Sequence, residues 1–328
     1  MVKYTVKRLF YMLFVFMVMS VILFGLFSMV PGDPARQEVE SLKETLKPDE
    51  YEAAYQAARE RLGLNDSVPV QYLKYIKGLS KGDLGRSLVH KMPVSKIVKD
   101  PLKVTIFINI FAVIIGLAIT IPLGIYSAIR KNSTFDKVVQ VLTIVGYSIP
   151  VFIFALLFIY LFAVKLGWFP VSGMGTPNIS GSSWFIFKDK MKHLALPLMV
   201  MTIGALGGIT RYVRAAMIDS LSMDYIKTAR AKGLSEKVVI YSHAWRNALL
   251  PVVTLLISWF MSIFFGSLII ERMFNLNGLG KLLIDSLNNQ DYNVVMAIQL
   301  FYMIIALTSN LLTDLSYGLV DPRVRVDG

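Results

Sequence analysis

Six apolar stretches, each about as long as a membrane-crossing helix, alternate with polar segments along the chain. A helix needs about 20 mostly apolar residues to cross the hydrocarbon core of a bilayer. The stretches that approach or exceed this length are Leu9–Val30, Val104–Ile129, Val138–Val164, Leu194–Thr210, Ala248–Ile270 and Val294–Thr313. The fourth is the shortest, and it contains Pro197 and three glycines. The pattern therefore predicts an all-α integral membrane protein with six transmembrane helices.

A segment of about 70 residues, more polar than the stretches on either side, separates the first two stretches. Its sequence predicts a helical insert outside the membrane. The segment from Lys47 to Leu64 has the pattern of a helix, with Pro48 in the first turn and Gly63 as its terminator. A second segment, Val68–Leu88, carries apolar residues at helical spacing before a glycine-rich stop. The insert would serve as a solvated cap or as a docking surface for an extracellular partner. We expect the next span to begin with Asp100 as its cap and Pro101 as its first helical residue.

The composition agrees with a membrane protein, and the placement of its charges predicts an orientation. The chain is 55% hydrophobic and only 17% charged, with a mean hydropathy of +0.57 and a net charge of +12. With the N-terminus inside, 15 Lys and Arg residues fall in cytoplasmic segments and six in the two shorter outer loops. The positive-inside rule therefore predicts that both termini are cytoplasmic. Attraction to anionic lipid accounts for the remaining basicity, and nucleic-acid binding is excluded.

The connection between the fourth and fifth stretches is the least apolar part of the second half of the chain. Its sequence, "DYIKTARAKGLSEKVVIYSHAWRNALLP", predicts one helix from Asp219 to Lys232, closed by Gly233 with left-handed backbone. A second helix, capped by Ser235, would bury one face formed by Val238, Tyr241, Trp245 and Ala248. Pro251 would kink or break the chain before the fifth span.

Two functions are open for the turn at Tyr225–Gly233. Lys227, Arg230 and Lys232 surround the small residues Ala229 and Ala231, a pattern that suits insertion into a groove of another protein. An ordinary interfacial helix, basic because it is cytoplasmic, would have the same composition.

Catalytic chemistry has little support in the sequence. Absence of cysteine excludes disulfides and thiolate chemistry. The run "NLNGLGKL" lacks the first glycine and the Ser or Thr of a phosphate-binding loop, and His90, His193 and His243 stand alone. We expect no enzyme activity, cofactor or metal in this chain. Gln140 and Gln299 lie within apolar stretches and are candidates for lining a transport pathway.

Several motifs, in order along nearly the whole chain, resemble one transporter family. They are "VPGDPA" (Val30–Ala35), the segment Leu62–Leu88, "TARAKG" (Thr228–Gly233), "HAWRNALLP" (His243–Pro251) and "YGLVDPRVR" (Tyr317–Arg325). The third and fourth resemble the EAA loop of permeases of ATP-binding-cassette importers, in the variant of the B-type subunits of oligopeptide and dipeptide systems. The chain departs from the family-wide pattern at Lys227, where a glutamate is usual, and at Arg246, where a proline is usual.

This resemblance implies a type I ABC importer permease fold and a place in a larger complex. It would have an N-terminal transmembrane helix at 1–30, an extracytoplasmic insert at 31–100, a five-helix core at 101–320 with a cytoplasmic coupling loop at 215–247, and a cytoplasmic tail at 321–328. The residues implied to couple to the ATPases are Tyr225, Lys227, Thr228, Ala229, Arg230, Ala231, Lys232 and Gly233.

The resemblance also implies the partners. They are a homologous second permease subunit, two cytoplasmic ATPases that bind ATP and magnesium, and an extracytoplasmic substrate-binding protein, all assembled at the cell membrane. The cargo would be oligopeptides or dipeptides, with a nickel chelate or another small solute as the alternative. An ion-coupled secondary transporter is the alternative from another class, but Asp314 is the only acidic candidate within a span.

Overall fold

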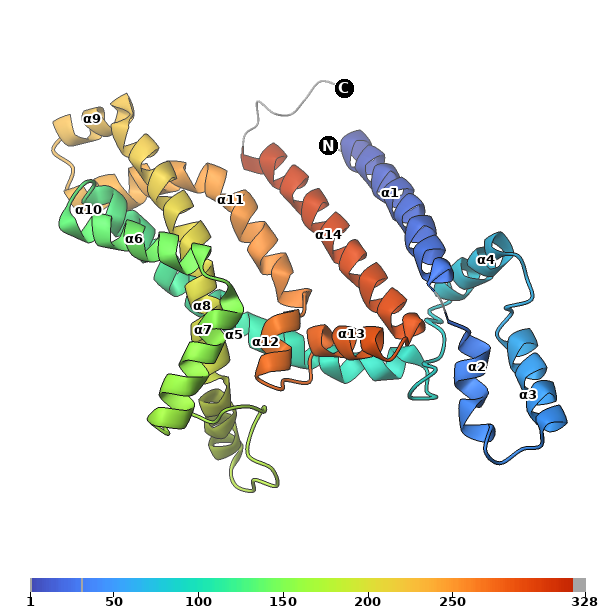
Figure 1. The fold of residues 1–328 in the computed structure, drawn as a ribbon. Coiled ribbons are helices and arrows are strands. Elements are labelled where there is room, and N and C mark those ends of the chain that lie inside the picture. The colour runs from blue at the N-terminus through green and yellow to red at the C-terminus, as the bar shows by residue number, and fades with distance from the viewer. Residues whose placement is uncertain (1, 31, 321–328) are drawn as a thin grey trace. The chain divides into compact units, whose positions relative to one another are not determined.

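The computed structural model describes residues 2–30 and 32–320, and within these ranges the chain is almost entirely helical (Figure 1). The one extended pairing among the described residues is an isolated bridge between Arg86 and Pro93. The α-helices are α1 Val2–Met29, α2 Pro34–Val39, α3 Pro48–Arg61, α4 Val68–Leu79, α5 Val94–Ile129, α6 Thr134–Ser148, α7 Val151–Phe158, α8 Ser183–Ser222, α9 Asp224–Ala231, α10 Glu236–Val238, α11 Arg246–Met261, α12 Leu268–Met273, α13 Leu279–Asn288 and α14 Tyr292–Val320. Short 3-10 turns cover Glu40–Leu42 and Ser262–Phe264, and π-helical segments cover Ile159–Lys165 and Val239–Trp245.

The predicted all-α membrane architecture is confirmed. Five helical segments of the described chain are long and apolar enough to cross a membrane: Thr5–Met29, Val94–Ile129, Ser183–Ser222, Pro251–Met273 and Tyr292–Ser316. A sixth crossing is present if the bent pair Thr134–Ser148 and Val151–Lys165 is counted as one span. Each of the six predicted stretches overlaps one of these segments. The fourth, which looked the shortest, lies inside the 40-residue helix α8.

The third predicted stretch is not one continuous helix. α6 and α7 meet at an angle of 100° on either side of Ile149 and Pro150. Ile149 adopts extended backbone (φ −83°, ψ 127°), as expected because a following proline clashes with the α conformation of the residue before it. A single straight span from Val138 to Val164 was therefore the wrong prediction, although its apolar length was correct.

Helix α5 begins earlier than expected. It starts at Val94 and runs through Asp100 and Pro101, so the predicted cap at Asp100 is wrong. The amide of Val94 donates to the carbonyl of Gly85, and the amide of Lys96 donates to that of Pro93, each at 3.0 Å. These bonds satisfy two donors that a helix start leaves unpaired, which stabilises a start before Pro101.

The chain divides into two compact units. The first contains residues 1–102 and 282–307, and the second contains residues 103–281 and 308–328. In the first unit, α3 has the expected form. Pro48 is its first residue, and Gly63 has a left-handed backbone (φ +69°). Leu64 N–H donates to Arg59 O and Gly63 N–H to Glu60 O, the two bonds of a Schellman helix end.

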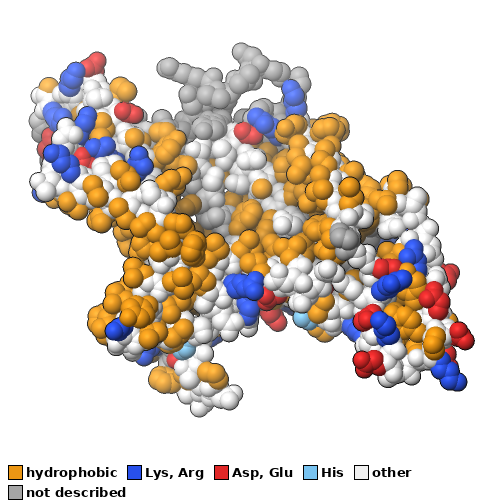
Figure 2. All heavy atoms as spheres, in the orientation of Figure 1, with side chains coloured by type: hydrophobic (Ala, Val, Ile, Leu, Met, Phe, Trp, Pro, Cys, Tyr) orange, Lys and Arg blue, Asp and Glu red, His pale blue; other side chains and the backbone are white. Residues whose placement is uncertain are grey.

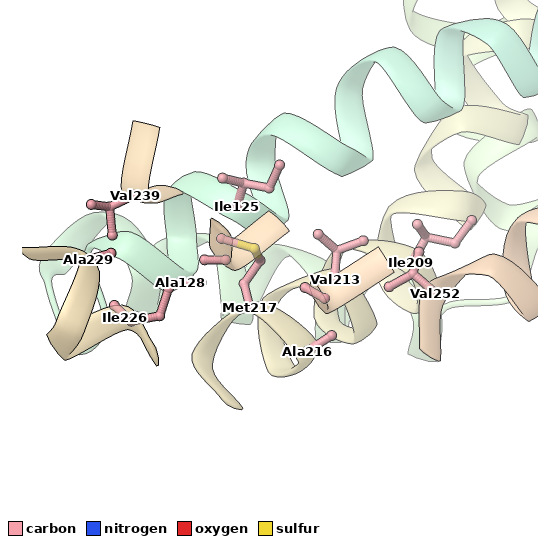
Figure 3. Close-up of a cluster of buried hydrophobic side chains, with 12 residues drawn as sticks. Ile125, Ala128, Ile209, Val213, Ala216, Met217, Ile226, Ala229, Val239 and Val252 are labelled. Carbon is pink, nitrogen blue, oxygen red and sulfur yellow. The ribbon is translucent and has the colours of Figure 1, made fainter. Parts of the chain in front are cut away.

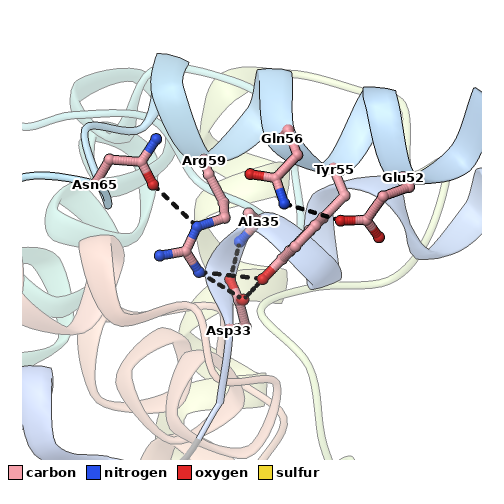
Figure 4. Close-up of polar contacts among 7 residues, drawn as sticks. All are labelled: Asp33, Ala35, Glu52, Tyr55, Gln56, Arg59 and Asn65. Carbon is pink, nitrogen blue, oxygen red and sulfur yellow. Dashed lines mark hydrogen bonds and ion pairs between the residues drawn. The ribbon is translucent and has the colours of Figure 1, made fainter.

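Asp33 joins α2 to α3 in this unit (Figure 4). Its carboxylate caps α2 by accepting from Ala35 N (2.9 Å). It also accepts from the hydroxyl of Tyr55 (2.5 Å) and from Nη1 of Arg59 (3.3 Å), both on α3. Partial burial opposes the charged form, but these hydrogen bonds and the Arg59 charge outweigh it and lower the pKa of Asp33. Ala35, Val39 and Ala58 form the small buried core beneath this contact.

In the second unit, small residues let α6 approach α8 closely. A Cβ added to Gly207 would lie 2.6 Å from Tyr147 Cβ and 3.0 Å from Thr143 O, and one added to Gly146 would lie 3.2 Å from Ile203 O. Glycine at such contacts is a common means of helix association in membranes. The backbone of α6 is thereby fixed against α8, the helix that leads into the α8–α11 connection.

Candidate functional site

The α8–α11 connection, residues 223–245, is built from three short helical segments. Met223 takes an extended conformation (φ −73°, ψ 151°) and ends α8, and α9 begins at the next residue. A single helix from Asp219 to Lys232 was therefore wrong, because the extended Met223 interrupts the hydrogen bonding between two separate helices. After α9 come α10 and the π-helical segment Val239–Trp245, which runs directly into α11.

Helix α9 is held against the unit by two side chains. Ile226 is fully buried and Ala229 is 5% exposed. They pack in a cluster with the end of α5, the second half of α8 and the π-helical segment, through residues that include Ala128, Met217 and Val239 (Figure 3). Ala229, expected on the projecting surface, thus faces the chain's own core. Its small side chain allows close approach of α9, a role that the resemblance did not suggest.

Gly233 closes α9 in the predicted way. Its backbone is left-handed (φ +75°). Leu234 N–H donates to Ala229 O (3.3 Å), and Gly233 N–H donates to Arg230 O (2.9 Å), which is again a Schellman end. No atom lies within 4 Å of a Cβ built on Gly233, so the backbone conformation, and not space, is what requires glycine here.

The exposed charges of α9 are paired within the connection. Lys227 Nζ contacts Asp224 Oδ1 at 2.8 Å, and both side chains are largely exposed. Arg230 donates to Glu236 through Nε (2.8 Å) and Nη2 (3.2 Å). This hydrogen-bonded pairing lowers the pKa of Glu236 and raises that of Arg230. Figure 2 shows the Lys and Arg side chains gathered around the α9–α10 end of the unit.

The remaining predicted coupling residues have differing surroundings. Thr228, Ala231 and Lys232 are exposed. Tyr225, which is 39% exposed, lies 2.8 Å from Ser220 Oγ through its hydroxyl, and Ser220 Oγ also donates to Ala244 O (2.8 Å). Ser220 therefore links the end of α8 to the π-helical segment. The partners Asp224, Glu236 and Ser220 were not predicted. Only Asp224 had a readable signal, its i,i+3 spacing from Lys227.

The buried face of the second half of the connection differs from the predicted face. Val238 is 39% exposed and Tyr241 is 53% exposed, whereas Val239 and Ala244 are fully buried and Ala248 is 2% exposed. The π-helical segment explains the shift, because its wider turn places Val239 and Ala244, five residues apart, on one side. The expected period of 3.6 was therefore wrong for Val238 and Tyr241, and right for Ala248 and for Trp245, which packs against the buried cluster. No break occurs at Pro251 either: α11 includes it, and the apolar span begins there.

A buried ion pair that the sequence did not reveal connects α8 to α6. Arg214 donates to both carboxylate oxygens of Asp136, through Nε and Nη2, each at 2.6 Å. Asp136 is 2% exposed, and it also accepts from Ser127 Oγ and from Asn132 N. The carboxylate thus joins the end of α5, the following turn, α6 and α8.

The two candidate pathway residues lie in different units. Gln140, on α6, is partly buried, and its Nε2 has no hydrogen-bond partner among the described residues. Gln299, on α14, is also partly buried. This amide nitrogen is itself buried within the unit, and the role of Gln140 in lining a pathway stays a prediction.

Residues near "NLNGLGKL" serve a different purpose from phosphate binding. Glu271 is 3% exposed; its carboxylate accepts from Lys281 N (3.0 Å) and from Thr105 Oγ1 (2.8 Å). A Cβ on Gly278 would lie 2.5 Å from Glu271 Cδ. A buried carboxylate therefore fills the place beside the start of α13, and the glycine makes room for it.

No metal-binding group was found in the described part of the chain, where no three His, Asp or Glu side chains cluster. One earlier expectation about histidine is wrong, because His193 is not alone. Its Nδ1 contacts Asp189 at 2.9 Å through the backbone oxygen and at 3.6 Å through the carboxylate. Asp189 is also bonded to Thr176, so the pair fastens the preceding loop to α8.

Comparisons with known proteins bear directly on this architecture. Residues 120–326 match the family described as "Binding-protein-dependent transport system inner membrane component", and residues 1–109 match the N-terminal region of such membrane components. The oligopeptide transport system permease protein AppB of Bacillus subtilis (strain 168) is 36% identical over 325 residues, with 99% of each chain covered. The dipeptide transport system permease protein DppB of Alkalihalophilus pseudofirmus is 34% identical over 339 residues, covering 99% of this chain and 100% of that protein.

The fold is also that of a solved importer. Inward-facing structures of the MetNI methionine ABC transporter include a chain that matches 67% of this one, with 95% of that chain covered, a TM-score of 0.51 and 15% identity. The relatives are permease subunits, which are non-catalytic components of transporters. The prediction from the motifs is confirmed: the chain belongs to the family of binding-protein-dependent transport system inner membrane components, as an ABC importer permease of the oligopeptide and dipeptide group.

Proposed function

We propose that this permease forms, with a second homologous permease, the translocation path for oligopeptides or dipeptides. An extracytoplasmic binding protein delivers the cargo, and two cytoplasmic ATPases hydrolyse ATP with magnesium. The cargo assignment is supported by the names of the full-length relatives, an oligopeptide permease and a dipeptide permease. Gln140 and Gln299, which are polar residues within apolar stretches, are the residues that we propose to line the path.

We also propose that α9 and its Gly233 turn are the surface that receives force from the ATPases. The observation that carries this proposal is the two-sided character of α9. One side is anchored in the core by Ile226 and Ala229, while Lys227, Arg230 and Lys232 stand exposed on the other. A helix anchored in this way transmits its displacement to its neighbours, because a close-packed protein interior has low compressibility and transmits strain.

Two routes carry such a displacement away from α9. Ser220, at the end of α8, is hydrogen-bonded to Tyr225 of α9 and to Ala244 of the π-helical segment. Because this segment runs into α11, α9 is linked to both α8 and α11. The Arg214–Asp136 pair then connects α8 to α6 and to the end of α5. Motion of α9 would therefore reach the cytoplasmic ends of four membrane helices together.

Exchange of the Arg230 and Glu236 side chains tests the coupling surface. Arg230→Glu alone reverses a projecting charge and also breaks an ion pair inside the chain. The double variant Arg230→Glu with Glu236→Arg restores the pair but leaves the charge pattern of the surface reversed. If this surface contacts the ATPases, both variants should co-purify with less ATPase and transport less peptide per ATP hydrolysed.

Full recovery in the double variant would instead assign Arg230 to internal stability alone and would contradict the proposed contact. Lys188→Gln, on the first turn and a half of α8, is the matched control, since it removes an exposed cation far along the chain from the connection. Its ATPase recovery and transport should equal those of the unmodified protein.

A further inference from the structure

An apolar groove on α5 ends beside an exposed cation. The groove has a volume of about 450 Å³. Its wall follows one face of α5, through Ala118, Ile119, Pro122, Leu123, Ile125, Tyr126 and Ile129, and is completed by Phe135 of α6 and Tyr241 of the π-helical segment. Four of these side chains are well exposed: Ile119, Tyr126, Ile129 and Tyr241.

The cation at the end of the groove is Arg130. Its guanidinium lies over the ring of Tyr126, 4.6 Å from the centroid, and Tyr126 itself meets Phe135 edge to face at 4.9 Å. The nearby carboxylate of Asp136 is already bound by Arg214, Ser127 and the amide of Asn132. No acidic side chain pairs with Arg130 or with the adjacent Lys131 among the described residues. Aromatic stacking holds the guanidinium in place while leaving its charge available.

We propose that this groove binds an anionic phospholipid of the cytoplasmic leaflet, with an acyl chain along α5 and the phosphate at Arg130. Charge complementarity carries the choice of occupant. The surface is apolar along its length and positive at one end, which matches a molecule with an apolar tail and an anionic head. Tyr126 and Arg130 also have the chemistry of residues enriched at the membrane interface.

A lipid bound in the groove would contact the segment that packs against α9. Tyr241, one wall of the groove, belongs to the π-helical segment whose Val239 and Ala244 pack against α9 and α8. Bound lipid would fill the space between this segment and α5. The proposal uses the cytoplasmic orientation of the α5–α6 turn but does not depend on ATPase contact at α9, so the two can fail separately.

Native mass spectrometry of the purified transporter complex tests the site. The complex is exchanged into phosphatidylcholine or phosphatidylglycerol of equal chain length, and the lipids retained are counted. Arg130→Gln should lower phosphatidylglycerol retention about fivefold, which corresponds to the roughly 1 kcal/mol expected for one basic residue near anionic lipid. Phosphatidylcholine retention should not change. Leu123→Trp, which fills the groove, should reduce retention of both lipids.

Lys188→Gln is again the matched control. Lys188 also lies over an aromatic ring, 5.2 Å from the centroid of Trp184, but does not line the groove. Equal phosphatidylglycerol retention in Arg130→Gln and in the unmodified complex would overturn the proposal. So would a photo-crosslinking residue at Ile119 that captures the second permease chain and no lipid, because the groove would then be a subunit contact.

Discussion

At the scale of single residues, the buried Asp136–Arg214 pair should contribute more to stability than an exposed ion pair of this protein does. Arg214→Gln would leave a carboxylate that is 2% exposed without its cation. Removing one member of a buried pair typically costs about 3–5 kcal/mol, because the other charge stays desolvated. We expect a clear drop in the thermal unfolding temperature of Arg214→Gln in detergent.

The control for this substitution is Lys227→Gln. Lys227 is paired with Asp224 at 2.8 Å, but their side chains are 73% and 93% exposed. Exposed pairs contribute about 0–1 kcal/mol, so this variant should unfold close to the temperature of the unmodified protein. Equal shifts in the two variants would contradict the structural importance of the Asp136 site.

At the scale of elements, acid should loosen the contact between α2 and α3. Burial raises the pKa of Asp33, but the hydrogen bonds from Tyr55 and Ala35 and the charge of Arg59 together lower it by more. The net effect is a pKa below the ordinary value. A carboxyl with a depressed folded pKa stabilises the fold above its unfolded pKa, about 3.9. That contribution is lost as pH falls from about 4 through the folded pKa.

Hydrogen exchange along α3 checks this expectation. Protection of Pro48–Arg61 should decrease below about pH 4 in the unmodified protein, after correction for the intrinsic pH dependence of exchange. In Asp33→Asn, protection should be lower at neutral pH and should lack this acid-dependent step. A step of the same size in both proteins would assign the titration to another group.

Some element boundaries could be predicted from the sequence because one residue decides them locally. Gly63 and Gly233 both end helices with left-handed backbone, as expected. Other boundaries depend on tertiary contacts that a local pattern does not contain. Pro101 and Pro251 lie inside helices, whereas the chain turns sharply at Pro150. A proline inside a helix removes a hydrogen bond and weakens the helix, but the surrounding packing decides between tolerance, a bend and a break.

The candidate site shows the same division between local and tertiary information. The motif "TARAKG" and its exposed cations could be read from the sequence. The extended Met223, which divides the predicted helix Asp219–Lys232 in two, could not. Neither could the π-helical segment Val239–Trp245, which alters the helical period on which the buried face was predicted. The Arg214–Asp136 contact joins residues 78 positions apart, so no helical spacing indicates it.

At the scale of the whole molecule, the two structural units follow the same broad division as the two family matches. The N-terminal match ends at residue 109 and the other begins at residue 120, whereas the first unit ends its N-terminal part at Leu102. Residues 282–307 return to that first unit from late in the chain. The insert and residues 282–307 therefore share one packed body, which the order of motifs alone did not indicate.

The orientation of the whole chain is the assumption on which force transfer at α9 depends. The excess of Lys and Arg in the segments assigned to the inside predicts that the α8–α11 connection is cytoplasmic and that the loop before α8 is outside. Because the chain contains no cysteine, single cysteines can report this directly. Lys232→Cys places one on the exposed end of α9, and Ser180→Cys places one on the exposed loop before α8.

A membrane-impermeant maleimide added to intact cells should label Ser180→Cys and leave Lys232→Cys unlabelled. Permeabilising the membrane should expose both, and detergent-purified protein should label at both positions, which controls for thiol accessibility. The opposite pattern in intact cells would place α9 outside, where no ATP-hydrolysing partner is available. In that case the charged surface of α9 would have to serve an extracellular contact, and displacement of α9 could not be driven by cytoplasmic ATPases.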